Sequence, residues 1–401
     1  MTVTIAPSAP AGSIAAPPSK SMAHRTLICA ALAGGGSLVR GVAASQDVLA
    51  TLDCLRALGA EFSYENGEVA FRGGVDLFSP PAEAALPCRE CGSTLRFFIP
   101  LCLLCGRELT LTGSETLLAR PLSVYADICE KQGLLFETHK TFLRARGPLR
   151  PWAFELPGDV SSQFVSGLLF ALPLLEGDSA LKLVPPVESR AYIDMTMDAL
   201  TAFGVTARWR DETAIAVPGG QKYRARSLSV EGDWSNAAPF LALGADVTGL
   251  DPNSTQGDKI CEAYFKALDA GPAELDISGC PDLGPVLMAY AALRSGGVLT
   301  GTRRLKLKES DRGEAMRVEL AKFGVEAVLE DNRVAVGRAP HAPSEVLDGH
   351  NDHRIVMALG VLCASVGGTI AGAEAVDKSF PGFFEQLKAI NVGVKKHGVD
   401  Q

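Results

Sequence analysis

Apolar and polar positions along the chain form two kinds of segment, and these segments alternate six times. The first kind is an apolar helical stretch that ends at glycine and continues into a short strand, as in CAALAGGGSLVRG at residues 29–41. Glycine after the last helical residue, followed by β-branched residues, is the usual signal for such a connection. The pattern recurs at residues 104–113, 174–184, 241–250, 293–302 and 365–373.

The second kind of segment is a helix, a glycine and a hairpin of alternating polar and apolar residues. It is clearest at residues 55–73, LRALGAEFSYENGEVAFRG, where Asn66-Gly67 is a typical hairpin turn. It recurs at residues 129–147, 200–219 and 320–337, with shortened versions at 265–279 and 387–396. Together the two kinds of segment predict an α/β (α+β) protein of six βαβαββ units, each about 50 to 75 residues long, in two domains of three.

The first helix of each unit begins in a polar stretch. Ser, Asn and Asp cap helices, but capping does not explain Lys20, Arg25, Arg96, His353 or Arg354. A helix N-terminus already attracts anions through its unpaired N–H groups and its dipole. We therefore expect the helix starts of both halves to face one cleft that binds a ligand with several negative charges. The stretches are SKSMAHR (19–25), CGSTLRF (91–97), VSSQF (160–164), DWSNAAPF (233–240), PDLGPVL (281–287) and NDHRIVM (351–357).

Composition narrows the class of protein. A chain of 401 residues with 47% hydrophobic residues can bury the cores of two or three domains, which argues against disorder. A net charge of −8 argues against a general nucleic-acid surface. The N-terminal residues do not resemble a signal peptide, and the longest apolar runs are too short to span a bilayer. These features favour a cytosolic protein.

The ten cysteines are interpreted as reduced thiols of the core. Cys88 and Cys91 with Cys102 and Cys105 have the spacing of paired zinc ligands, yet the second pair lies inside the apolar run IPLCLLCG without a turn. We therefore predict no metal site.

Two charged motifs add candidate chemistry. RLKLKESDRGEAM, at residues 304–316, would usually be a solvated surface, but it adjoins a predicted helix start at Ser310. DKSFPGFF, at residues 377–384, places Lys378 before a Phe/Pro turn. No G-x-S-x-G, H-E-x-x-H or Walker A motif is present. Asp282 and Glu309 remain, as carboxylates among many cations, and this composition suits acid–base chemistry on a polyanion.

The motifs PSKSMAHR, CGSTLRF, GDVSSQF, STQGDK, KESDR, NDHR and DKSFPGF occur in this order over nearly the whole chain. In this respect the sequence resembles the 5-enolpyruvylshikimate-3-phosphate synthases of the enolpyruvyl transferase family. The resemblance implies an inside-out α/β barrel fold, with two domains of three βαβαββ repeats whose helices lie inside the sheets. One domain would comprise residues 20–230 and the other residues 1–19 with 231–401. The two hinge crossings would fall near residues 18–20 and 230–233.

The resemblance also implies an activity. The enolpyruvyl group of phosphoenolpyruvate would be transferred to the 5-hydroxyl of shikimate 3-phosphate through a tetrahedral intermediate, with release of phosphate. This is the sixth step of the shikimate pathway, which leads to chorismate and the aromatic amino acids. No metal or organic cofactor is implied. The expected partners are these two small molecules, with no nucleic acid or membrane, and the expected state is a cytoplasmic monomer. Glyphosate is expected to compete with phosphoenolpyruvate.

Roles for individual residues follow by resemblance alone. Asp282 matches the family's base and Glu309 its acid, with Lys20 sharing the proton transfer. Tyr192 would line the same pocket. The residues implied to hold phosphoenolpyruvate are Lys20, Gly92, Arg120, Gln163, Arg312, Arg354 and Lys378. Those implied to hold shikimate 3-phosphate are Lys20, Ser21, Arg25, Ser161, Ser162, Gln163, Ser189, Asp282 and Lys308.

Several positions depart from the family pattern. Arg304 stands where many relatives have Asn, Glu90 and Cys91 replace an Asn-Ala pair, and Trp234 and Asn236 alter a Gly-Asp-x-Ser-Ser pattern. The segment 250–280 is also short.

Two other functions stay open on sequence grounds. The first is the sister enzyme that acts on UDP-N-acetylglucosamine. It is disfavoured because that family has a reactive Cys where this chain has Glu115, and a Lys-Asn pair where this chain has Lys20-Ser21. The second is a non-catalytic module that binds anions in the same cleft. The presence of both Asp282 and Glu309 argues against it.

Overall fold

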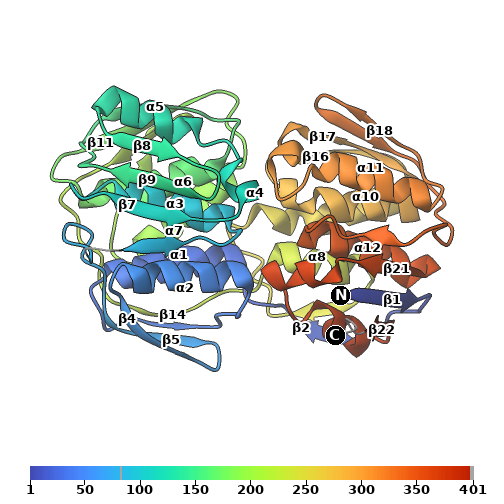
Figure 1. Ribbon diagram of the computed structural model, residues 1–401. Coiled ribbons are helices and arrows are strands. Elements are labelled where there is room, and N and C mark those ends of the chain that lie inside the picture. The colour runs from blue at the N-terminus through green and yellow to red at the C-terminus, as the bar shows by residue number, and fades with distance from the viewer. Residues whose placement is uncertain (82–83, 398–401) are drawn as a thin grey trace. The chain divides into compact units, whose positions relative to one another are not determined.

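The computed structural model describes residues 1–81 and 84–397, and the chain forms two compact units (Figure 1). The continuous unit is Pro18–Glu231. The split unit combines Met1–Pro17 with the chain from Gly232 onward. The chain therefore passes from one unit to the other after Pro17 and again after Glu231.

Within the described residues, the continuous unit contains three four-stranded sheets of one topology. In each sheet the first two strands are parallel, and an antiparallel hairpin completes the sheet. In spatial order the sheets are β14 (Ser227–Ser229), β3 (Leu38–Arg40), β5 (Glu68–Gly73), β4 (Glu61–Glu65); β6 (Ala85–Pro87), β7 (Leu109–Thr112), β9 (Phe142–Arg146), β8 (Leu135–Thr138); and β10 (Ala153–Pro157), β11 (Ser179–Val184), β13 (Ala214–Val217), β12 (Arg208–Trp209).

The Asn66-Gly67 turn lies where the sequence predicts it. It joins β4 to β5, and both residues have positive φ, 49° for Asn66 and 77° for Gly67. Such angles are those of the tight turns that match the twist of a hairpin.

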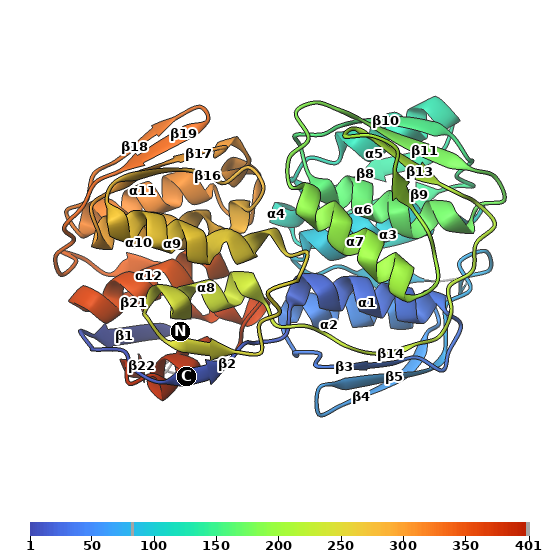
Figure 2. The ribbon, with the colours of Figure 1, turned by 180° about the vertical axis from the view of Figure 1, so that it is seen from behind.

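The first helix of each repeat in the continuous unit has most of its residues buried. These helices are α1, α3 and α6. A helix that is apolar on all sides must be enclosed, so the sheets take the outer positions. Figures 1 and 2 show β3, β4, β5 and β14 on the outer side of α1 and α2. The helices are α1 (Lys20–Leu32), α2 (Gln46–Ala57), α3 (Gly92–Cys102), α4 (Glu115–Leu118), α5 (Ser123–Gln132), α6 (Ser162–Ala171), the 3-10 turn η1 (Leu172–Leu174) and α7 (Arg190–Ala202).

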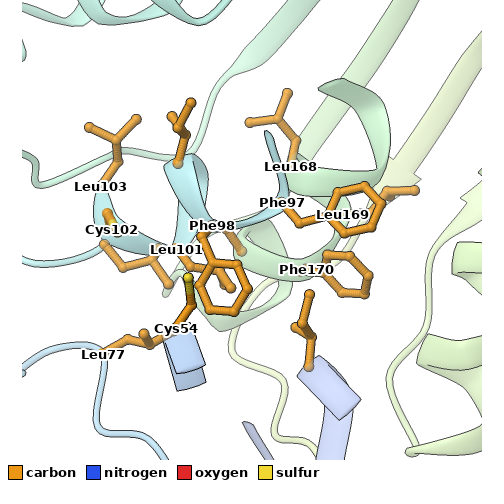
Figure 3. Packing of buried hydrophobic residues seen from close by; sticks show 14 of the residues in the cluster. Cys54, Leu77, Phe97, Phe98, Leu101, Cys102, Leu103, Leu168, Leu169 and Phe170 are labelled. Atoms are coloured by element: carbon orange, nitrogen blue, oxygen red, sulfur yellow. The ribbon is translucent and has the colours of Figure 1, made fainter. Parts of the chain in front are cut away.

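Aromatic side chains from α3 and α6 form the centre of this core (Figure 3). The rings of Phe97 and Phe170 meet edge to face, with their centroids 5.3 Å apart. Cys54 and Cys102 lie among the same apolar side chains. All ten cysteines belong to the described part of the chain and are buried, free thiols, as the sequence predicts for core residues.

The split unit repeats the topology with one reduced copy. The described residues form two four-stranded sheets and one pair of strands. Strand β1 lies between β21 and β22 and is antiparallel to both, so the N-terminal residues complete a sheet made by the C-terminal ones. The sheets are β20 (Leu347–Asp348), β21 (Gly368–Ala371), β1 (Thr2–Ala6), β22 (Gly393–His397); β16 (Ala273–Asp276), β17 (Gly297–Thr300), β19 (Arg333–Val336), β18 (Ala327–Glu330); and β15 (Asp246–Thr248) with β2 (Ser13–Ala15).

In this unit α8, α10 and α12 are the enclosed helices. Figures 1 and 2 place β1, β2 and β22 on one side of α8 and α12, and β16 to β18 beyond α10 and α11. The helices are α8 (Trp234–Ala242), α9 (Cys261–Ala270), α10 (Gly284–Leu293), α11 (Arg312–Lys322), α12 (His353–Val366) and α13 (Phe383–Ala389). The 3-10 turns are η2 (Gly257–Ile260), η3 (Pro281–Leu283), η4 (Arg303–Leu307) and η5 (Ala373–Lys378).

The six polar stretches do begin helices. Ser19, Cys91, Ser161, Asp233 and Asp352 are N-cap residues whose side chains accept a backbone N–H of the first turn. The sixth stretch begins as η3 and continues into α10. Among the residues described, every helix is too short or too polar to cross a membrane.

Candidate active site

The split unit gathers three carboxylates around the guanidinium of Arg312, at the start of α11. Nε of Arg312 donates to Oδ2 of Asp352 at 2.8 Å, one NH group donates to Oδ1 of Asp282 at 2.8 Å, and the other donates to Oε2 of Glu309 at 2.7 Å. The Arg312 side chain is only 1% exposed. Because a guanidinium has five donors in a fixed plane, Arg312 fixes the positions of all three carboxylates.

Asp282, in η3, is surrounded by cations. Its Oδ1 accepts from Nζ of Lys308 at 2.9 Å as well as from Arg312, and its Oδ2 lies 3.9 Å from a terminal nitrogen of Arg354. Burial by itself would raise the pKa of Asp282, but Lys308, Arg312 and Arg354 outweigh it and hold the pKa well below its usual value. Asp282 is therefore an anion at neutral pH, and an anionic carboxylate can accept a proton.

Lys308 and Arg304 form the cationic border of this cluster. Burial lowers the pKa of Lys308, Asp282 raises it, and Arg312 and Arg304 lower it again, with a net decrease. Arg304, one of the departures from the family pattern, is buried in η4. Its charge thus acts on Lys308 from within the same cluster.

Arg354 and Lys378 are held by polar partners at the start of α12 and the end of η5. Arg354 donates to Oδ1 of Asn236 at 3.0 Å, and Asn236 is also bonded to Ser379. Nζ of Lys378 donates to the carbonyl oxygen of Asn351 at 2.7 Å. Within residues 1–81 and 84–397, the buried Nε of Arg354 has no hydrogen-bond partner. An unsatisfied buried donor is costly, so this atom is a natural contact for a ligand oxygen.

In the continuous unit Lys20 opens α1 and pairs with a carboxylate of α2. Its Nζ lies 2.9 Å from Oδ2 of Asp47, and the two side chains are 12% and 11% exposed. Two further groups lie close to Asp47, namely His24, one turn after Lys20 on α1, and Cys91 at the N-cap of α3. Burial, then the charges of Lys20 and Arg25, lower the pKa of His24 well below its usual value, so its ring is neutral at pH 7.

A second group in the continuous unit surrounds Gly92, the first residue of α3. A Cβ added at Gly92 would lie 2.9 Å from a terminal nitrogen of Arg120, 3.3 Å from one of Arg96 and 3.8 Å from Oε1 of Gln163. Arg96 donates to that Gln163 oxygen at 2.7 Å, and Gln163 donates to Ser93 at 2.9 Å. Among the described residues, the buried Nε of Arg120 has no hydrogen-bond partner.

Arg25 has a structural role that the sequence did not indicate. Its guanidinium donates to the hydroxyl of Thr196 and to the carbonyl oxygens of Ser21 and Tyr192, at 2.8, 2.7 and 2.9 Å. Burial lowers its pKa to about 10, so it stays protonated at neutral pH. Arg25 therefore joins α1 to α7, and its expected contact with an anionic ligand stays a prediction.

Ser161, Ser162, Ser189 and Tyr192 lie at the starts of α6 and α7. Ser161 is the N-cap of α6 and accepts from the N–H of Gln163 at 3.3 Å, and Ser162 is buried beside it. Ser189 is buried at the N-cap position of α7 with φ of 53°, in the left-handed region. A non-glycine residue in this region is strained by about 1 kcal/mol or more, and such strain is concentrated at functional sites.

Sequence reasoning missed Asp47 and Asp352 as partners of the cations. In the sequence, Asp47 in SQDV looks like a first-turn acidic residue, and Asp352 in NDHR looks like an N-cap. Both are common at helix starts, so neither stands out as a partner for a cation. These cations therefore have partners within the protein, because Asp47 pairs with Lys20, Asp282 with Lys308 and Asp352 with Arg312. Trp234 also has a local role, since its indole N–H donates to the carbonyl oxygen of Asp251 at 3.1 Å.

Comparisons with known proteins agree over almost the whole length. Residues 6–387 match the model of the family described as EPSP synthase (3-phosphoshikimate 1-carboxyvinyltransferase). A 3-phosphoshikimate 1-carboxyvinyltransferase from Clostridium kluyveri is 37% identical over 414 residues, covering 97% of this chain and 97% of that protein. One from Clostridium perfringens is 36% identical over 416 residues, covering 97% and 98%.

The fold is also that of a solved enzyme. The structure of EPSP synthase from Acinetobacter baumannii superposes with a TM-score of 0.78 at 24% identity, covering 99% of this chain and 100% of that one. The likeness agrees with two sets of βαβαββ repeats whose helices lie inside, which is the fold class that the sequence predicts. With the match over residues 6–387 and relatives above 35% identity, the chain belongs to the EPSP synthase (3-phosphoshikimate 1-carboxyvinyltransferase) family.

Proposed function

We propose that this protein transfers the enolpyruvyl group of phosphoenolpyruvate to the 5-hydroxyl of shikimate 3-phosphate, releasing phosphate. Family membership supports the reaction, and one observation supports the chemistry. Asp282 is an anionic carboxylate in contact with Lys308 and Arg312 and 3.9 Å from Arg354. The cations keep Asp282 ionised, so it can accept a proton, and they offer partners to a substrate that is itself an anion.

Asp282 takes the proton of the 5-hydroxyl as that oxygen attacks the cationic carbon derived from phosphoenolpyruvate. Lys308 orients the Asp282 carboxylate and binds shikimate 3-phosphate. Arg312, Arg354 and Lys378 bind phosphoenolpyruvate. Among the described residues, Nε of Arg354 has no hydrogen-bond partner. This supports the assignment, because a carboxylate or phosphate oxygen of the substrate would accept its hydrogen bond.

The continuous unit supplies the remaining contacts. Lys20, Gly92, Arg120 and Gln163 bind phosphoenolpyruvate, and the contacts around Gly92 support a shared role for the last three. Ser21, Arg25, Ser161, Ser162 and Ser189 bind shikimate 3-phosphate, together with Lys20 and Gln163, and Tyr192 lines the pocket.

Glu309 and Lys20 share the proton that reaches the vinyl carbon. Glu309 accepts a hydrogen bond from Arg312 at 2.7 Å, and this ion pair favours the ionised carboxylate. A general acid must carry a proton, so Glu309 has to gain one when the substrates bind. Lys20, a cation at neutral pH, can donate in the same step.

We further propose that the protein is a cytoplasmic monomer with residues 20–230 as one domain and residues 1–19 with 231–401 as the other. The compact units Pro18–Glu231 and Met1–Pro17 with the chain from Gly232 support these domains. The reaction as proposed needs no cofactor.

The test is phosphate release on mixing the purified protein with phosphoenolpyruvate and shikimate 3-phosphate. UDP-N-acetylglucosamine in place of shikimate 3-phosphate should release none, and an Asp282→Asn protein sets the background. Turnover with the UDP-sugar alone would overturn the proposal. Binding of both anions without turnover would instead identify a non-catalytic module.

A further inference from the structure

Three residues from three different elements of the continuous unit bring metal-binding atoms together. His24 lies on α1, Asp47 on α2 and Cys91 at the N-cap of α3, and all three are buried. One ligand atom from each, an imidazole nitrogen, a carboxylate oxygen and a thiol sulfur, lies within 4.8 Å of the others. The reaction proposed above uses none of these three side chains directly.

The geometry of the pair formed by His24 and Cys91 suits a tetrahedral ion. Sγ of Cys91 lies 3.9 Å from Nε2 of His24. Zinc bonds of about 2.3 Å to sulfur and about 2.0 Å to nitrogen place two tetrahedral ligands roughly 3.6 Å apart. A shift of a few tenths of an ångström would therefore seat the ion between them.

The other ring nitrogen of His24, Nδ1, already makes the kind of hydrogen bond that orients metal-binding histidines. Its Nδ1 lies 2.7 Å from Oγ1 of Thr51, and that hydroxyl lies 2.8 Å from Oγ1 of Thr94. A hydrogen bond at one ring nitrogen fixes the orientation of the imidazole and leaves the other nitrogen facing Cys91. The hydroxyl groups of Thr51 and Thr94 thus hold the His24 ring in the orientation that the site needs.

We propose that His24, Asp47 and Cys91 form a site for a borderline-soft divalent cation, best met by Zn²⁺, which competes with Lys20 for Asp47. Thiolate and imidazole ligands select such ions, whereas Mg²⁺ and Ca²⁺ prefer oxygen. On binding, the thiol of Cys91 releases its proton to solvent and a sulfur–metal bond forms. No electron is transferred.

Occupation of this site separates Lys20 from its partner. An ion bound to the Asp47 carboxylate neutralises the charge that Nζ of Lys20 now approaches to 2.9 Å, and it repels the ammonium group. The ion enters from the side of Lys20 and Asp47, whose side chains are 12% and 11% exposed, because Cys91 is only 1% exposed. Zn²⁺ therefore displaces Lys20 and inhibits turnover. The inhibition rests on the proposed role of Lys20, but the binding does not.

Binding is tested with Co²⁺ as an optical probe of the full-length protein, kept reduced with a phosphine. A thiolate–cobalt charge-transfer band is expected in the near ultraviolet at one ion per chain, and Zn²⁺ should abolish it by displacement. Cys91→Ser should lose the band while keeping the fold, because Ser is a good N-cap. Cys88→Ser, three residues earlier, is the matched control and should retain it. A band that survives Cys91→Ser, or no band in the wild type, would overturn the site.

Competition is tested with Lys20→Met. Removing the ammonium group from Asp47 should tighten Co²⁺ binding at least tenfold by titration of the same band. Unchanged affinity would refute competition with Lys20. In the phosphate-release assay, micromolar Zn²⁺ should inhibit the wild type and spare Cys91→Ser, while Mg²⁺ should affect neither. Equal inhibition of both proteins would reject this site as the cause.

Discussion

Arg312 and Asp352 form an ion pair that is closed to solvent. Nε of Arg312 lies 2.8 Å from Oδ2 of Asp352, and their side chains are 1% and 0% exposed. The Asp352 side chain also caps α12 through the N–H of Arg354. The pair therefore links the start of α11 to the start of α12. Arg312 thus contributes to the fold as well as to the proposed binding of phosphoenolpyruvate.

Replacing Arg312 should destabilise the folded protein as well as inactivate the enzyme. Arg312→Met leaves Asp352 buried without its cation, and breaking a buried pair from one side costs about 3–5 kcal/mol of unfolding free energy. Urea denaturation measures this. Arg317→Met, on the same helix, removes only an exposed pair with Glu314 and should cost less than about 1 kcal/mol. Equal losses in the two variants would show that the network around Arg312 adds no stability.

Asp282→Asn should abolish most turnover with the fold retained. Asn keeps the shape and one acceptor oxygen but cannot take a proton, so kcat should fall about 10²- to 10⁴-fold. Circular dichroism should match the wild type. Asp269→Asn, which alters an exposed carboxylate paired with Arg294, is the control and should leave kcat unchanged. A near-normal kcat for Asp282→Asn would remove Asp282 from the role of base.

Lys20→Ala or Arg120→Ala should reduce turnover without unfolding the chain. Each removes one cation from a proposed contact with developing negative charge, which is worth about 10²- to 10³-fold in rate. Arg40→Ala, whose partner Glu68 is exposed, should keep full activity. If circular dichroism shows that either variant loses its fold, the role of that cation is structural.

Gly92→Ala should weaken phosphoenolpyruvate binding specifically. The added Cβ would come within 2.9 Å of Arg120 and 3.3 Å of Arg96, and both guanidinium groups are flexible ends that can move aside. We expect a higher KM for phosphoenolpyruvate, weaker inhibition by glyphosate and a small change in KM for shikimate 3-phosphate. Gly106→Ala is the control, because its Cβ would meet nothing within 4 Å. Glyphosate binding that is undiminished in Gly92→Ala would contradict this.

His350 should make stability depend on pH. Its Nε2 lies 2.9 Å from Oε1 of Glu319, and this hydrogen bond raises the pKa of His350, with burial acting in the opposite direction. Because the folded pKa lies above the unfolded one, the stabilisation is complete below about pH 6.5 and is lost as the pH rises through the folded pKa. The stability advantage of the wild type over His350→Gln should therefore shrink between pH 6 and 9 in urea titrations. A stability difference that stays constant over this range would contradict the role of the hydrogen bond to Glu319.

The repeats, the helix starts and the family could be predicted from the sequence because each depends on local signals. A glycine stop, an Asn-Gly turn and an N-cap act within a few residues, so the chain itself specifies them wherever it folds. The order of seven motifs likewise needs no geometry. On this basis the hairpin at Asn66-Gly67 and the helix starts were predicted correctly, the resemblance implied the enclosed helices, and the roles of the candidate site residues stay predictions.

Tertiary structure decided which charges meet. Asp47 lies 27 residues from Lys20, Asp352 lies 40 from Arg312, and Thr196 lies 171 from Arg25. Only packing of separate helix starts brings these groups within hydrogen-bond distance, since pairing between distant positions depends on how buried faces dock. The same packing places His24, Asp47 and Cys91 together, although in the sequence they are an apolar-helix histidine, a first-turn aspartate and a capping cysteine.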